Sequence, residues 1–195
     1  MSLALPPAPV EPRRRQLLVA TALASTAMAM LFAGLLGIWV AERSAAGGTT
    51  EAWLPQGASV PQITTTLMLV TMFGICIVAQ WAVWSMKHGD RTDSVLALGV
   101  LVVFAAAMIV MQVNVWERTE LAVAEGTYQV LFYGVTGAFL VAIVVGLVFG
   151  AVIAFRELGG RYSARDTEGL SSLALYWYVL TAVFVSLWYI VYVLK

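Results

Sequence analysis

Residues 126–155 read GTYQVLFYGVTGAFLVAIVVGLVFGAVIAF and contain no Asp, Glu, Lys, Arg or His. A helix needs roughly 20 apolar residues, at about 1.5 Å per residue, to cross a hydrocarbon core of about 30 Å. This run is longer than that. Four more uncharged runs of sufficient length occur at 16–40, 62–86, 94–116 and 169–194. The sequence therefore predicts an all-α integral membrane protein with five transmembrane helices.

The composition agrees with a membrane protein. The chain of 195 residues is 61% hydrophobic and 11% charged, whereas soluble domains carry about 25% charged residues. Residues 1–12 include four prolines, and we expect them to form a disordered cytoplasmic tail. Residues 13–195 are expected to form a single transmembrane domain. The first run, 16–40, is longer than the roughly 7–15 apolar residues of a signal peptide, which favours a retained first span.

Basic residues between the runs predict the orientation. With a cytoplasmic N-terminus, eight basic residues fall on the cytoplasmic side and three on the other side. The positive-inside rule favours this arrangement, so we expect the N-terminus in the cytoplasm and the C-terminus outside. The eight are Arg13, Arg14, Arg15, Lys87, Arg91, Arg156, Arg161 and Arg165, and the three are Arg43, Arg118 and Lys195.

Small residues at four-residue spacing mark two faces for close packing. One is Ala29, Ala33 and Gly37 in the first run; the other runs through the fourth as Gly134, Ala138, Ala142, Gly146 and Gly150. Lipid is as apolar as leucine, so close backbone approach and interhelical hydrogen bonds drive helix association in a membrane. We interpret both faces as contacts within the bundle. A groove for lipid or a partner is the alternative.

Uncharged polar residues and tryptophans gather near the ends of the runs. Gln112 and Asn114 come just before Trp116 and Glu117. A buried amide in a membrane needs a hydrogen-bond partner, so these residues are predicted to link helices. Contact with a lipid headgroup or a partner protein is the alternative. Trp39, Trp53, Trp84, Trp116 and Trp188 are expected at the membrane–water interfaces, where indole rings are enriched.

The residues needed for redox or metal chemistry are absent from the runs. His88 is the only histidine and Cys76 the only cysteine, so neither a set of haem or copper ligands nor an internal disulfide can form. The carboxylates Glu117, Glu120 and Glu125 lie together after the third run and are expected to be solvated rather than to bind a cation. No proline interrupts the runs after Gln62, which predicts continuous helices.

Short motifs in the runs and loops, taken in order, are shared with one known family. The chain resembles subunit III of the haem–copper oxidases (cytochrome c oxidase subunit III) in its short, five-helix bacterial form. The motifs are Leu31-Phe32-Ala33-Gly34-Leu35, Trp53-Leu54-Pro55, Gln80-Trp81 leading to Gly89-Asp90, Asn114-Val115-Trp116-Glu117, Phe132-Tyr133 with Thr136-Gly137, and Tyr176-Trp177 with Trp188-Tyr189.

The chain departs from this family at its polar membrane positions, which marks it as a divergent member. The family has a glutamate where Met28 stands and two histidines where Phe139 and Ala142 stand. A histidine and an aspartate of the family correspond to Tyr178 and Thr181. The resemblance therefore implies roles that depend on packing and lipid contact. Roles tied to those polar groups, such as support of proton uptake, are put in doubt.

The resemblance implies a non-catalytic subunit of a respiratory haem–copper oxidase in a bacterial plasma membrane. Such a subunit stabilises catalytic subunit I, lies in a complex with subunit II, and holds phospholipid. It binds no cofactor itself; haem and copper are expected in the catalytic subunit. Contacts with lipid or the partner are expected at Gln112, Asn114, Trp116, Glu117, Gly134, Ala138, Tyr176 and Trp177.

Three alternative functions use the same features. A small passive transporter would need only the five-helix bundle, because an uncharged interior argues against ion or proton coupling. An assembly factor for a respiratory complex would have the same sequence features as a permanent subunit. A subunit-III-like protein associated with nitric oxide reductase would share the motifs and their polar departures.

Overall fold

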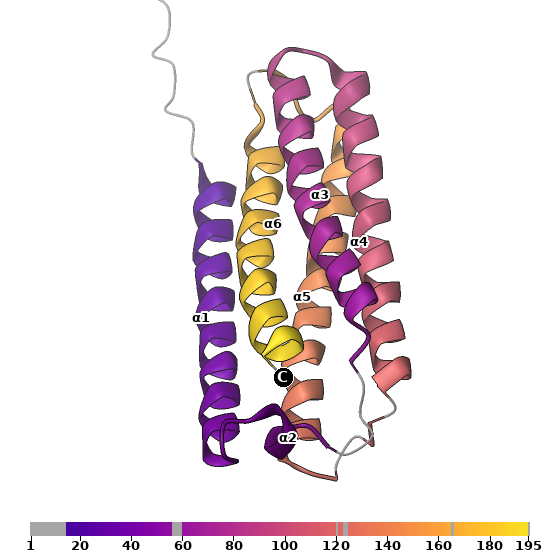
Figure 1. The fold of residues 1–195 in the computed structure, drawn as a ribbon. Coiled ribbons are helices and arrows are strands. Elements are labelled where there is room, and N and C mark those ends of the chain that lie inside the picture. Colours follow the sequence, from indigo (N-terminus) through magenta and orange to yellow (C-terminus); the bar gives the residue numbers. More distant parts are fainter. Residues whose placement is uncertain (1–14, 56–59, 120, 123–124, 165, 195) are drawn as a thin grey trace, which may run out of the picture.

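The computed structural model describes residues 15–55, 60–119, 121–122, 125–164 and 166–194. They form an all-α bundle with five helices that are long and apolar enough to cross a membrane (Figure 1). These are α1 (Gln16–Ala45), α3 (Gln62–Lys87), α4 (Arg91–Thr119), α5 (Thr127–Leu158) and α6 (Glu168–Leu187). The predicted fold class is therefore confirmed. The predicted tail, 1–12, lies outside the described residues.

Two elements were not predicted. A short helix, α2 (Thr50–Trp53), lies in the loop after α1, and a π-helical segment, η1 (Trp188–Val193), ends the last span. Sequence analysis predicted an unbroken last helix, and the π-helical segment is the difference. Side chains of neighbouring helices hold the carbonyls there: Arg43 donates to Leu194 O at 3.0 Å, and Gln62 Nε2 donates to Tyr192 O at 2.9 Å.

The helices run past the uncharged stretches at several ends. Arg43, Arg91 and Arg156 are all helical, although the predicted spans ended before Arg43 and Arg156 and began after Arg91. A charge ends the hydrocarbon-compatible stretch without ending the helix, because the backbone hydrogen bonds continue into the headgroup layer. Arg43 and Arg156 lie in the last turns of their helices, where the helix dipole favours a positive charge.

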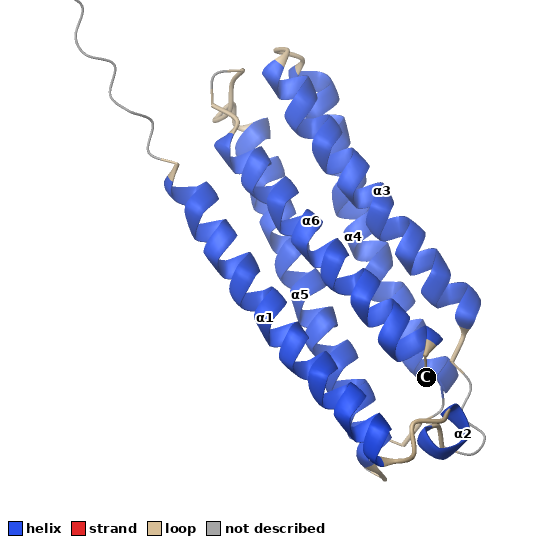
Figure 2. Ribbon diagram, turned by 60° about the vertical axis from the view of Figure 1, so that its left-hand side comes forward, coloured by secondary structure: helices blue, strands red, loops and turns tan. Residues whose placement is uncertain are grey.

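Helix α6 is the centre of the arrangement. It packs against α1, α3 and α5, and α4 lies between α3 and α5 (Figures 1 and 2). Its membrane-spanning part has the largest buried share of the five spans. Helix α1 lies at the edge of the bundle, where its main neighbour is α6. We refer to the two ends of the bundle as the α2 end and the α3–α4 turn end.

The small residues of the two stripes have different surroundings. Gly146 is in tight contact with α6: a Cβ atom there would lie 2.8 Å from both Trp177 Cζ2 and Tyr176 Cε1. Gly150 is similarly close to Leu101 Cδ2, at 3.1 Å. The packing prediction is thus confirmed for this part of α5. It is wrong for Ala33 and Gly37 of α1, because Ala33 is exposed and no atom lies within 4 Å of a Cβ built on Gly37. Helix α1 contacts the bundle through the neighbouring face with Phe32, Leu36 and Trp39, and of the stripe only Ala29 packs against the core.

Candidate functional site

The eight residues expected to contact lipid or a partner do not form one site. Gln112, Tyr176 and Trp177 are buried within the bundle. Asn114, Trp116 and Ala138 are half-buried, and Glu117 and Gly134 are exposed on the outside of their helices. Five of the eight therefore have surface that a partner could contact: Asn114, Trp116, Glu117, Gly134 and Ala138.

The polar residues near the ends of α4 do link helices. Trp116 Nε1 donates to Thr136 Oγ1 of α5 at 2.9 Å. Tyr192 of η1 donates its hydroxyl to Gln112 Oε1 at 3.5 Å, at the limit of a hydrogen bond. Gln112 Nε2 has no partner among the described residues. Trp116 and Gln112 therefore link α4 to its neighbours α5 and η1.

Tyr176 and Trp177 fix the contact between α5 and α6. The Tyr176 hydroxyl donates to Ala142 O at 2.6 Å, and the two rings enclose the face of α5 that carries Gly146. Trp177 is fully buried and its Nε1 has no hydrogen-bond partner among the described residues. Both side chains serve the packing of the bundle.

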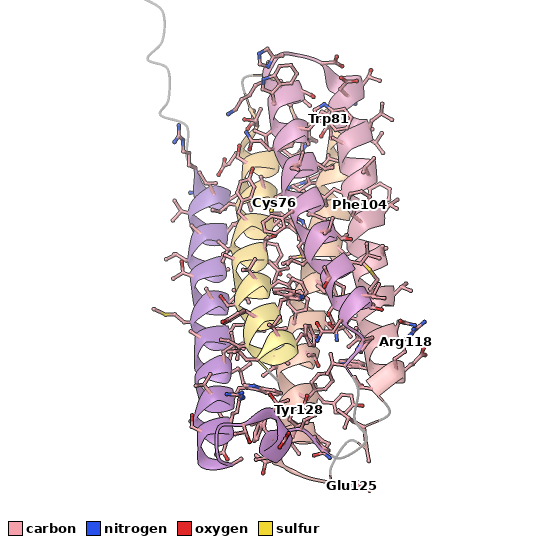
Figure 3. The ribbon with its side chains drawn as sticks, in the orientation of Figure 1. Cys76, Trp81, Phe104, Arg118, Glu125 and Tyr128 are labelled. Atoms are coloured by element: carbon pink, nitrogen blue, oxygen red, sulfur yellow. The ribbon has the colours of Figure 1, made fainter. Side chains whose placement is uncertain are left out.

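At several positions the resembled family has a polar residue and this chain has another residue. In the structure, the side chains at most of these positions are packed inside the bundle. Phe139 is fully buried and stacks on Phe184 with ring centroids 4.7 Å apart. Ala142 lies against Tyr176. The Thr181 hydroxyl lies 3.1 Å from Cys76 Sγ, half-way along the bundle (Figure 3).

Tyr178 is the exception among these positions, because 39% of it is exposed. Its hydroxyl donates to Gln80 Oε1 of α3 at 2.7 Å. The pair lies on the wall of a groove of about 490 Å³ that sequence analysis missed. We call it the α6 groove, because α1 and α3 flank it and α6 is its floor. Its lining is mainly apolar, with Lys87 at one end: Leu18, Val19, Ala22, Gln80, Val83, Lys87, Ser171, Ala174, Leu175 and Tyr178.

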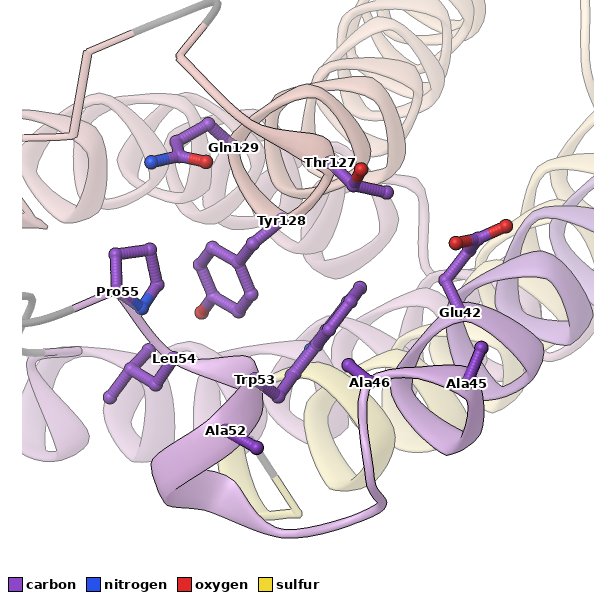
Figure 4. A pocket seen from close by; sticks show the side chains of 10 residues that line it. All are labelled: Glu42, Ala45, Ala46, Ala52, Trp53, Leu54, Pro55, Thr127, Tyr128 and Gln129. Carbon is purple, nitrogen blue, oxygen red and sulfur yellow. The ribbon is translucent and has the colours of Figure 1, made fainter.

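A second pocket, of about 460 Å³, lies at the α2 end. We call it the α2 pocket (Figure 4); Glu42, Ala45, Ala46, Ala52, Trp53, Leu54, Pro55, Thr127, Tyr128 and Gln129 line it. Two of these lining residues, Trp53 and Tyr128, form an aromatic cluster with Trp39. The ring centroids are 5.5 Å apart for Trp39 and Trp53, 5.2 Å for Trp39 and Tyr128, and 5.5 Å for Trp53 and Tyr128.

This cluster gives two tryptophans a packing role that the sequence did not predict. Trp39 and Trp53 were expected at the membrane–water interface; within the protein both are buried and in contact with each other. Helix α2 turns the loop back over the end of the bundle and places Trp53 against Trp39. The capping contact that holds α2 is visible in the sequence in retrospect, because Thr49 Oγ1 accepts from the backbone N–H of Ala52 at 3.3 Å.

The α3–α4 turn end carries a buried carboxylate. Glu157 is fully buried, and its carboxylate lies near the Ser94 hydroxyl and the Arg91 guanidinium. The nearby Arg91 guanidinium donates to the carbonyls of Glu157 and Leu158 at 2.7 and 2.8 Å, which satisfies the end of α5. In the adjoining loop, burial raises the pKa of the Tyr162 hydroxyl. No three His, Cys, Asp or Glu side chains in the described ranges come together as a metal site.

The fold and these surfaces define a class: a multi-pass helical membrane protein in which several buried hydrogen bonds, such as those from Trp116 to Thr136 and from Tyr176 to Ala142 O, join one helix to another. Comparison with known proteins identifies the family within this class. The profile of the family described as cytochrome c oxidase subunit III matches residues 17–195. The chain belongs to the cytochrome c oxidase subunit III family.

Individual relatives agree with this assignment. Cytochrome c oxidase subunit 3 of Sus scrofa is 24% identical over 163 residues, which are 79% of this chain and 61% of that protein. The protein of the same name from Strongylocentrotus purpuratus is 26% identical over 147 residues, 72% of this chain and 55% of that protein. The chain thus spans about three fifths of the length of the curated relatives it matches.

Proposed function

We propose that this protein is a non-catalytic subunit of a respiratory haem–copper oxidase complex. In this complex it packs beside the catalytic subunit I, and subunit II is a further component. The observation that carries the proposal is the family match over nearly the whole chain, residues 17–195. In this proposal haem and copper belong to the catalytic subunit. The contribution of this chain is packing and lipid contact, in a bacterial plasma membrane.

Two surfaces support this role. The outward face of α1, with Ala33, Gly34 and Gly37, lets another helix approach closely. The α6 groove has an apolar lining for an acyl chain, and Lys87 at one end suits the phosphate of a lipid. The exposed or half-exposed residues Asn114, Trp116, Glu117, Gly134 and Ala138 remain proposed contact residues.

Co-purification tests the assignment. We expect the tagged protein, extracted in mild detergent, to be recovered with a haem-containing subunit in a fixed ratio, as measured by its optical spectrum and by mass spectrometry. Recovery of the protein without any haem-containing subunit would contradict the proposal. If deleting the protein prevents formation of the mature complex, but the protein itself is absent from that complex, it is an assembly factor. Solute uptake into proteoliposomes that contain this protein alone would indicate a transporter.

A matched pair of glycines tests the contact surface separately. Gly134 on α5 and Gly99 on α4 each have no atom within 4 Å of a built Cβ, so leucine fits at both positions in the isolated chain. We expect Gly134→Leu to reduce the co-purified haem several-fold, because it fills a close contact with the partner, and Gly99→Leu to leave it unchanged. If both variants co-purify with equal amounts of haem, Gly134 is not part of the interface. The family assignment does not depend on this result.

The proposed orientation places the α2 end outside and the α3–α4 turn end in the cytoplasm. Arg15, Lys87, Arg91, Arg156 and Arg161 all lie at the latter end. In a Cys76→Ala background, we expect Ala46→Cys to react with a membrane-impermeant maleimide in intact cells. Thr92→Cys, also exposed but at the other end, should react only after permeabilisation. The opposite labelling pattern would reverse the topology.

A further inference from the structure

We propose that the α6 groove binds a segment of this same chain, residues 7–11, which read Pro-Ala-Pro-Val-Glu and precede α1. Residues 7–10, the proline segment, lie extended in the groove, and Glu11 pairs with Lys87 at its α3–α4 turn end. The proline segment competes with a lipid chain for this groove. The inference goes beyond the proposed subunit function and does not depend on it.

The first observation is the place and length of the groove. Helices α1 and α3 flank α6 (Figure 1), and Leu18, the third residue of α1, lines the groove, so the chain enters the bundle beside it. From Lys87 to Gln80 the groove follows about 10 Å of α3. The proline segment spans about 12 Å in the polyproline II conformation. Residues 11–15 reach up to about 16 Å, which is enough to reverse the chain at this end.

The second observation is a match of single charges. Lys87 is the one charged side chain among the described residues that line the groove, and it is exposed. Glu11 is the only acidic residue in the sequence 1–15. With the proline segment against the apolar lining, Glu11 comes next in the sequence at the end where Lys87 stands. An exposed ion pair adds little stability, but this one decides in which direction the segment runs.

The third observation is how the groove meets the backbone of a proline-rich segment. Backbone N–H groups without a partner are costly in apolar surroundings, and proline has none, so Pro7 and Pro9 halve the donors of the proline segment. The Tyr178 hydroxyl donates to Gln80 Oε1 at 2.7 Å, which leaves the Gln80 amide N–H groups to donate to a backbone carbonyl. The exposed Tyr178 ring offers the aromatic surface on which polyproline II segments pack. An acyl chain has no acceptor for the Gln80 amide.

Disulfide cross-linking of the full chain in native membranes tests the proposal. In a Cys76→Ala background, Ala8→Cys is combined either with Ala22→Cys, which lines the groove, or with Ala20→Cys, which is exposed on the same helix outside it. Copper phenanthroline oxidises the cysteines, and mass spectrometry of tryptic peptides measures the yield, because trypsin cuts at 13–15 between them. We expect the Ala22 pair to form several-fold more disulfide than the Ala20 pair. A segment that does not bind the groove would give similar yields for both.

Charge reversal tests the ion pair in the same cross-linking assay. We expect Glu11→Lys, and separately Lys87→Glu, to lower the yield of the Ala22 pair about two- to fivefold, the range of an exposed ion pair. The two changes together should restore it, which a general loss of structure would not do. Equal yields of the Ala22 and Ala20 pairs in membranes would overturn the proposal. An unchanged yield in Glu11→Lys, or no recovery in the double variant, would also overturn it. A preference for Ala22 that arises only after lipid is removed in detergent would show that lipid occupies the groove, and would overturn it as well.

Discussion

Replacing Gly146 with leucine is expected to separate α5 from α6 and to destabilise the bundle by about 3 kcal/mol or more, the upper part of the range for overpacked cores. A Cβ at this position would lie 2.8 Å from an atom of Trp177 and 2.8 Å from an atom of Tyr176. Neither ring can retreat easily. Trp177 is fully buried, and the Tyr176 hydroxyl is held by Ala142 O at 2.6 Å. The melting temperature in detergent measures the loss.

Gly137→Leu is the matched control for this prediction. It makes the same change on the same helix, at a position where no atom lies within 4 Å of a built Cβ. Leucine ranks just below alanine as a helix former, and glycine is roughly 0.8–1 kcal/mol worse than alanine, so stability should be retained or slightly increased. A Gly146→Leu protein as stable as Gly137→Leu would mean that the α5–α6 contact is looser than the structure shows.

The membrane spans could be predicted from the sequence because hydrocarbon excludes charge over a fixed length. That constraint fixes the number of helices but not their ends, which is why Arg91 and Arg156 are helical beyond the predicted limits. Small residues allow two helices to approach closely, but they do not say which face has a neighbour. The stripe on α5 is packed at Gly146, whereas the stripe on α1 is open at Gly37.

The candidate sites were harder to predict because they depend on how a loop folds back. Trp53 follows a glycine-rich stretch, and its position along the sequence suggested an interfacial residue. In the structure, α2 places it beside Trp39 and Tyr128, residues far apart in the sequence. The α6 groove was missed for a related reason: it exists because α1 and α3 both pack on α6 and leave a gap over it.

Restoring a family histidine at Phe139 is expected to destabilise the bundle by about 2–4 kcal/mol, because it removes apolar contacts and buries a polar ring. Phe139 is fully buried, stacks on Phe184 at 4.7 Å and meets the edge of Phe32 at 6.4 Å. An aromatic hydrocarbon fits this environment, and an imidazole leaves polar nitrogens among phenyl rings. Denaturation in detergent, followed by circular dichroism, measures the difference.

Tyr178→His provides the comparison, since it also restores a family histidine but at a position that is 39% exposed. It loses one hydrogen bond to Gln80, worth about 0.5–1.5 kcal/mol, which an imidazole can partly replace. If Phe139→His proved as stable as Tyr178→His, the aromatic contact would not be what excludes the histidine. If the two differ as expected, the stacked contact with Phe184 is what disfavours a histidine at Phe139. Recovering the histidine would then require changes at Phe184 as well, because the stacked partner now defines the shape of the site.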